Sequence, residues 1–280
     1  MAGIFDGLEA FGLNAESGES MFKDPAKKEA APAEENKPQH TEEEYILDKT
    51  FKCPVCGRDF KSKVMKAGKA KLVSQDMDLR PRYEFVDATK YDIIMCPKCG
   101  YAALTRYFET LAPSQEKRIR ESVASKFGGM KPETESTYSY DAAKARFKLA
   151  LVCTMVKQTK ASELAYLMLR NGWLIRGEYE SLDQNIPNYA ARVTELQDEE
   201  EQYLSKALEG FLKARETESF PIAGMNESTL DYIISVLATR FEKYDVAAQL
   251  VSKLLTDRTL NARMRDNLQE LKETIIKARK

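Results

Sequence analysis

The chain of 280 residues contains one histidine, one tryptophan and no long apolar run. A single histidine, His40 in a polar segment, rules out any mechanism that needs two histidines and disfavours histidine-based catalysis altogether. The longest apolar runs, of about five residues, are far shorter than the ~20 residues that a membrane-spanning helix needs. The N-terminus is acidic and lacks the basic start and apolar core of a secretory signal. These absences predict a cytoplasmic protein without a membrane span.

The overall charge is balanced, with 43 Lys and Arg against 44 Asp and Glu. This balance argues against a uniformly basic nucleic-acid coat and against a polyacidic tail. The charge is unevenly distributed, however: residues 1–49 carry −7, residues 50–100 carry +5, and the remainder carries +1. Composition changes at the same boundaries, which indicates separate zones.

The first zone contains two kinds of sequence. In residues 1–14, which contain no Lys or Arg, five apolar side chains fall on one helical face, namely Ile4, Phe5, Leu8, Phe11 and Leu13. This pattern suggests either an amphipathic docking peptide or an N-terminus with no such role. Residues 15–44 are rich in Glu, Lys, Ala and Pro, and we expect a disordered acidic linker because they can bury little apolar surface.

The remaining zones predict an α+β protein that is mostly α. Residues 45–110 form a small β-rich domain, with short β-branched or aromatic runs at 71–74, 83–87 and 91–95. Residues 111–280 follow helical periodicity. The predicted helices cover 140–158, 161–179, 189–217, 228–242, 245–256 and 260–278. Short connections between them favour antiparallel helix pairs, and Ser228 is the expected N-cap of its helix.

Two copies of the pentapeptide Cys-Pro-x-Cys-Gly, at 53–57 and 96–100, carry the strongest chemical signal. The proline favours a tight turn, and the glycine tolerates the positive φ that turns backbone N–H groups toward the sulfurs. Two such turns supply the four soft ligands of a closed structural Zn²⁺ site, one ion per chain. The expected ligands are Cys53, Cys56, Cys96 and Cys99. Bound iron, a redox dithiol pair and a disulfide are the alternatives. The 39 residues between Cys56 and Cys96 imply an inserted hairpin or more.

Other polar and reactive residues have simpler interpretations. Cys153 lies in an apolar helical stretch and is expected to be a buried core residue. Residues 199–201, three consecutive glutamates, predict a solvent-facing helix surface. No paired carboxylates, phosphate-binding glycine loop or catalytic triad stands out, so the sequence does not predict an enzyme.

The basic residues of the ribbon zone allow two interpretations. Lysines and arginines near aromatic side chains can contact nucleic acid, and charged side chains also protect exposed strand edges. The candidate contacts are Lys61, Lys63, Lys66, Arg80, Arg82 and Tyr83.

Residues 232–255 resemble a tetratricopeptide unit. The matching positions are Ile234, Tyr244, Ala247, Val251 and Leu254. The segment departs from the pattern by having Ser235 in place of glycine and by lacking a closing proline. A weaker helix pair, 140–158 with 161–179, has Ala165 and Leu169 at matching positions. Helix pairs of this kind leave a concave groove that commonly binds a peptide.

The whole arrangement resembles a bacterial family, catalogued as a domain of unknown function, that joins a double Cys-Pro-x-Cys-Gly zinc ribbon to tetratricopeptide-like helices. The resemblance covers residues 45–278 and depends on five segments: 51–60, 78–83, 91–104, 173–176 and 220–225. It implies a cytoplasmic, metal-binding bacterial protein and no particular activity.

Together these patterns lead to one principal hypothesis and two alternatives. The principal one is a non-enzymatic adaptor in which a zinc ribbon accompanies a helical groove for a protein or peptide partner. Nucleic-acid binding through the basic ribbon is the main alternative, and redox sensing by labile zinc thiolates is another. No pattern specifies an oligomeric state.

Overall fold

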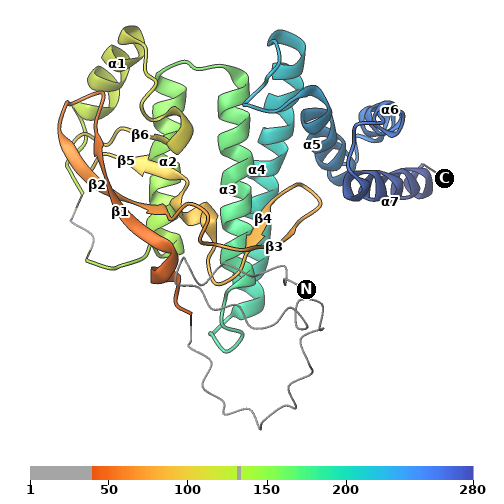
Figure 1. The fold of residues 1–280 in the computed structure, drawn as a ribbon, viewed down its shortest axis with the longest axis horizontal. Helices are drawn as coiled ribbons and strands as arrows, with labels where there is room; N and C mark the ends of the chain where they lie inside the picture. Colours follow the sequence, from red (N-terminus) through yellow and green to blue (C-terminus); the bar gives the residue numbers. More distant parts are fainter. Residues whose placement is uncertain (1–39, 131–133, 280) are drawn as a thin grey trace, which may run out of the picture. The chain divides into compact units, whose positions relative to one another are not determined.

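In the computed structural model, which describes residues 40–130 and 134–279, three two-stranded hairpins precede seven α-helices within the described segments (Figure 1). The predicted α+β class, mostly α, is confirmed. The predicted docking peptide and residues 15–39 of the predicted linker lie outside the described residues. At the end of that linker, residues 42–45 form a 3₁₀ turn, and Glu42 accepts hydrogen bonds from Lys90 and Tyr91.

All three hairpins are antiparallel, and two of them have a cysteine pair at their turn. The first hairpin joins β1 (Ile46–Lys52) to β2 (Asp59–Met65), and the last joins β5 (Ile93–Met95) to β6 (Ala102–Leu104). Between them lies the hairpin of β3 (Leu72–Gln75) and β4 (Pro81–Tyr83), which is the insertion implied by the cysteine spacing.

The strand prediction at 83–87 is wrong except for its first residue. Only Tyr83 belongs to a strand, and Phe85 has φ +64°, in the left-handed region that a β-strand does not use. Strands β1, β2 and β6 were not predicted, and in β1 the buried positions do not alternate regularly. In β1 only Ile46 and Phe51 are buried among five exposed residues.

The helices agree with the predicted periodicity. Among the described residues they are α1 (Pro113–Ile119), α2 (Tyr140–Val156), α3 (Ala161–Glu180), α4 (Tyr189–Thr217), α5 (Glu227–Arg240), α6 (Tyr244–Leu255) and α7 (Ala262–Ala278). Only α1, which continues into a π-helical turn at Arg120–Ala124, was not predicted. Helices α2, α3 and α4 lie side by side (Figure 1). No helix in the described part of the chain is long and apolar enough to cross a membrane.

The N-cap of α5 differs from the prediction. The side chain of Asn226 accepts a hydrogen bond from the Thr229 amide at 2.9 Å, so Asn226 is the cap. Ser228 lies within the helix, and its hydroxyl bonds the Asp257 carboxylate at 2.6 Å. Both residues are good capping types, and only the geometry of the preceding loop distinguishes them.

Separate groups of buried side chains connect the hairpins to the helices. Helices α3 to α7 enclose the largest apolar cluster, which contains buried side chains such as Phe211 and Tyr232. A second cluster surrounds the cysteines, and a third packs Ile93 and Met95 of β5 against Phe147 of α2. The last contact holds the β5–β6 hairpin, and with it one cysteine pair, against α2.

Candidate metal centre

Each Cys-Pro-x-Cys-Gly motif folds as the turn of a hairpin. In the first, the Gly57 amide donates to the Cys53 carbonyl at 2.9 Å, and in the second the Gly100 amide donates to the Cys96 carbonyl at 2.9 Å. The two glycines have φ +70° and +72°, a conformation that costs glycine little. The repeated pentapeptide therefore produces the same turn twice, as its proline and glycine predict.

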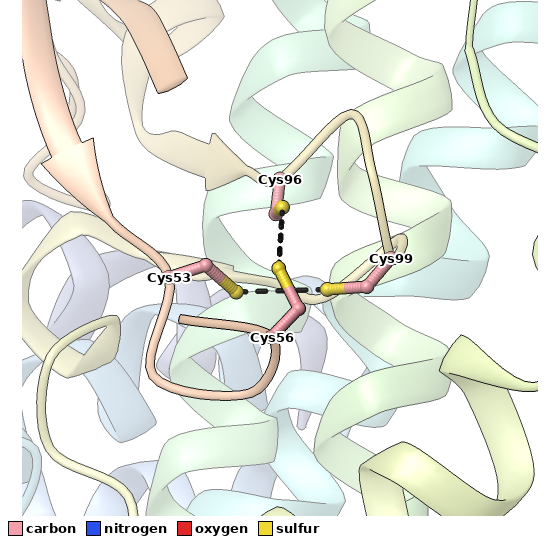
Figure 2. Close-up of side chains that lie close together, drawn as sticks. All are labelled: Cys53, Cys56, Cys96 and Cys99. Atoms are coloured by element: carbon pink, nitrogen blue, oxygen red, sulfur yellow. Dashed lines mark hydrogen bonds between the residues drawn. The ribbon is translucent and has the colours of Figure 1, made fainter. Parts of the chain in front are cut away.

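The two turns bring all four cysteine sulfurs together (Figure 2). Cys53 Sγ lies 3.5 Å from Cys99 Sγ, and Cys56 Sγ lies 3.7 Å from Cys96 Sγ. All four sulfurs lie within 4.8 Å of one another. A tetrahedral ion with metal–sulfur bonds of about 2.3 Å separates its ligands by about 3.8 Å, whereas a disulfide needs about 2.05 Å. The cluster is therefore spaced for a metal ion, and all four thiols are free.

Both close sulfur contacts join one turn to the other, so neither cysteine pair forms the site alone. Hydrogen bonds with the Cys53 and Cys99 thiols lower the pKa of the Cys96 thiol. The contact with the Cys96 sulfur raises the pKa of the Cys53 thiol, and contacts with the Cys53 and Cys96 sulfurs raise the pKa of the Cys99 thiol. Metal binding must displace the protons held between these sulfurs, which makes it dependent on pH.

Aromatic side chains surround the cluster and restrict water access. The Phe108 ring lies 5.0 Å from the Tyr101 ring and 6.0 Å from the Phe51 ring, measured between centroids. The Tyr101 hydroxyl donates to the Phe108 carbonyl at 3.2 Å. Cys53, Cys96 and Cys99 are buried, whereas Cys56 is half-buried beside a cavity that Arg120 also lines.

Cys153 is fully buried on α2, as predicted. It also contacts the second cysteine turn, which the sequence did not indicate. Its sulfur accepts a hydrogen bond from the Ala102 amide at 3.4 Å and donates to the Gly100 carbonyl at 3.6 Å. Burial raises the pKa of this thiol to about 11, so it stays protonated at neutral pH. Cys153 therefore supports the backbone of the turn from outside the four-sulfur cluster.

The candidate nucleic-acid residues divide into two groups. The three lysines lie on β2 or directly after it: Lys61 is exposed, Lys63 pairs with Asp48 at 3.1 Å, and Lys66 donates to the Glu44 carbonyl at 2.9 Å. Only the Lys61 ammonium lacks a bonding partner among the described residues.

The two arginines belong to an internal network. Arg80 is 6% exposed and pairs with Glu180 at 2.8 Å. Arg82 pairs with the other oxygen of Glu180 at 2.7 Å and with Asp76 at 3.1 Å. Tyr83 is half-buried on β4. The arginine charges are thus matched by carboxylates of the protein itself, so they contribute little to a basic surface.

The prediction that residues 199–201 face solvent is wrong for Glu200, which is fully buried on α4. Its carboxylate accepts hydrogen bonds from Arg176 at 2.6 and 2.8 Å and from the Tyr179 hydroxyl at 2.8 Å. The sequence did contain a signal for this position. Leu196 and Leu204, four residues before and after Glu200, are fully buried on the same helical face.

Arg176 on α3 is the centre of this network. Its hydrogen bonds to Asp76, Asp78 and Glu200 lie between 2.6 and 3.1 Å and use all five guanidinium N–H groups. The indole of Trp173 donates to Asp78 at 3.0 Å. The network connects the loop between β3 and β4 to α3 and α4, so it fixes the inserted hairpin against the helices.

The fold and the cluster define an α+β protein, mostly α, with four cysteines able to hold a metal ion. The family model described as "Uncharacterized protein conserved in bacteria (DUF2225)" matches residues 46–275, and the chain belongs to this family. An uncharacterized protein of Borreliella burgdorferi is 26% identical over 86 residues, which are 28% of this chain and 30% of that protein. The chain thus matches less than a third of this relative's length. No solved structure matches the chain.

Proposed function

We propose that the four cysteines hold one structural Zn²⁺ and that the protein is a non-enzymatic adaptor for a protein or peptide partner. In this proposal the metal ties the β1–β2 and β5–β6 hairpins together, and the helices carry the partner surface. A reducing cytoplasm is the expected compartment, because four free thiols are kept reduced there.

The closed set of four thiols is the observation that carries the proposal. Four thiolates complete the tetrahedral shell that Zn²⁺ prefers in structural sites, so no position is left for a reacting water. Soft sulfur ligands favour zinc over magnesium or calcium. By tying the two hairpins together, the bound metal would supply folding free energy.

The adaptor part of the proposal is supported by the helical half of the chain. Helices α5 and α6 pack as a pair, with Ile234 and Ala247 fully buried in the helical core. On the outer face of α2, Val152 is 48% exposed and Met155 is 65% exposed. Neighbouring exposed apolar side chains are more typical of a contact surface than of a purely solvated helix.

Cobalt substitution tests the metal part. Co²⁺ bound by four thiolates gives a visible absorption spectrum, and a closed shell predicts that added azide leaves that spectrum unchanged. An azide-dependent spectrum would reveal an open coordination position and contradict a purely structural ion.

Photo-crosslinking tests the adaptor part. A photoreactive amino acid replaces Met155 on α2 in the full-length chain, with replacement of exposed Lys117 on α1 as the control. We expect a discrete protein adduct at position 155 and none at 117. Absence of adducts at position 155 and throughout the exposed positions of α5 to α7 would count against the adaptor.

A further inference from the structure

A cavity of about 300 Å³ lies between α3, α5, α7 and the loop that joins β3 to β4. Its apolar wall is formed by Met77, Val236, Leu237 and Leu271. The backbone of Met77 is fixed, because its carbonyl accepts a hydrogen bond from the buried Tyr232 hydroxyl at 2.9 Å. Ligand pockets of this kind combine an apolar wall with a few polar groups, and this volume is at their lower limit.

The positive charges of the cavity wall are already paired. Arg176 lines the cavity, yet all five of its N–H groups bond to carboxylates. Arg240, which also lines it, pairs with Glu200 at 3.1 Å and with Glu201 at 2.7 Å. An anionic ligand would therefore have to displace buried carboxylates, which makes the cavity a poor anion site.

The negative charge of the cavity is not fully paired. Glu270 on α7 lines the cavity and is exposed, and in the described part of the chain its carboxylate has no hydrogen-bond or ion-pair partner. Behind the cavity, the ion-pair network joins four arginines to six carboxylates. This network thus holds two more carboxylates than arginines, a charge balance that favours a cation over an anion at the cavity.

We propose that this cavity binds a basic side chain, lysine or arginine, of a partner peptide. The aliphatic stem of that side chain packs against Leu237 and Leu271, and its cationic head pairs with Glu270. Burying the stem while the charge stays at the mouth is how long basic side chains normally meet an apolar surface. The inference rests on the proposed adaptor function and specifies the chemistry of the partner.

Fluorescence anisotropy on the full-length protein tests the inference. The probes are three labelled heptapeptides that differ only in the central residue, which is lysine, norleucine or glutamate. We expect the lysine peptide to bind up to about fivefold tighter than the norleucine peptide, which is the upper range for an ion pair with an exposed carboxylate such as Glu270. The glutamate peptide should bind most weakly.

Three variants locate the binding. Glu270→Gln should remove the preference for lysine, whereas Glu273→Gln, a matched change at an exposed position of the same helix, should leave it intact. Thr274→Arg places an arginine one turn after Glu270 at the mouth of the cavity, where it supplies an internal cation. This variant should weaken the lysine peptide as strongly as Glu270→Gln does.

Equal binding of the three peptides, or equal loss in the Glu270 and Glu273 variants, would overturn the inference. Its failure can be told apart from failure of the adaptor function. If the same crosslinked adduct forms equally with the wild type and with the Thr274→Arg variant, the adaptor function is supported and this cavity is excluded as its binding site. Absence of any crosslinked partner would count against the adaptor itself.

Discussion

Replacing Arg176 by methionine should be strongly destabilising. Methionine keeps an unbranched apolar stem but lacks the guanidinium that bonds Asp78 and Glu200, both of which are buried. Removing one partner of a buried ion pair costs about 3–5 kcal/mol. Glu200 retains its bond from Arg240 at 3.1 Å, so we expect a loss near the lower end, about 3 kcal/mol.

Urea unfolding at pH 7, followed by tryptophan fluorescence, measures this loss directly. Trp173 is the single tryptophan, and its indole bonds Asp78 within the same network, so its emission reports the perturbed site. Lys206→Met is the control, because the Lys206–Glu209 pair is exposed, and such a pair contributes about 1 kcal/mol or less. A loss for Arg176→Met no larger than that of the control would refute the assigned role of the network.

The pH dependence of the same variant gives an independent check. A buried carboxylate without a cation is stabilised by protonation, because burial disfavours its charged form. The folded variant should therefore bind protons more readily than its unfolded chain. As a result, its loss in free energy of unfolding relative to the wild type should shrink between pH 7 and pH 5.5. A deficit that stays constant or grows over this range would contradict the electrostatic explanation.

Three further comparisons test other parts of the molecule. Cys96→Ser should abolish stoichiometric metal binding, whereas Cys153→Ser should retain the metal and lower the free energy of unfolding by about 1–2 kcal/mol, both measurable by elemental analysis and urea unfolding. Gly100→Ala should lower the free energy of unfolding more than Gly57→Ala does. Both glycines have positive φ, but of the two only at position 100 would a Cβ lie 2.6 Å from a side-chain carbon. Equal losses of unfolding free energy in the two variants would contradict this reasoning. Burial tends to raise the pKa of Glu180, but hydrogen bonds from two arginines outweigh it and hold that pKa below the usual 4.5. The contribution of Glu180 to the free energy of unfolding should be complete above pH 4.5 and fall as the pH drops further. Glu180→Gln should therefore make the free energy of unfolding less dependent on pH at acidic pH.

Local patterns made much of the fold and the four-cysteine cluster predictable. The repeated pentapeptide identified all four clustered cysteines, because turn geometry and ligand spacing are properties of five adjacent residues. Helix α4 matched its predicted range of 189–217, because the helical spacing of apolar residues is a property of that segment alone. The burial of Cys153 followed from its apolar neighbours in the same way.

Features that depend on distant parts of the chain were not predictable in this way. The helical spacing of Leu196 and Leu204 marks the buried face on which Glu200 lies, but its partner Arg176 lies 24 residues away on another helix, and no local pattern pairs the two. Asp78 meets Arg176 across 98 residues. Each charge taken alone suggests a surface position, and only the packing of the inserted hairpin on α3 brings opposite charges together in the interior.

The most direct test of the account is the metal content of the purified, untagged protein. Elemental analysis against a protein concentration from amino-acid analysis should give one zinc per chain, with the ion lost in the Cys96→Ser variant. A protein that folds with no zinc, or that contains iron in its place, would contradict the proposed structural zinc centre.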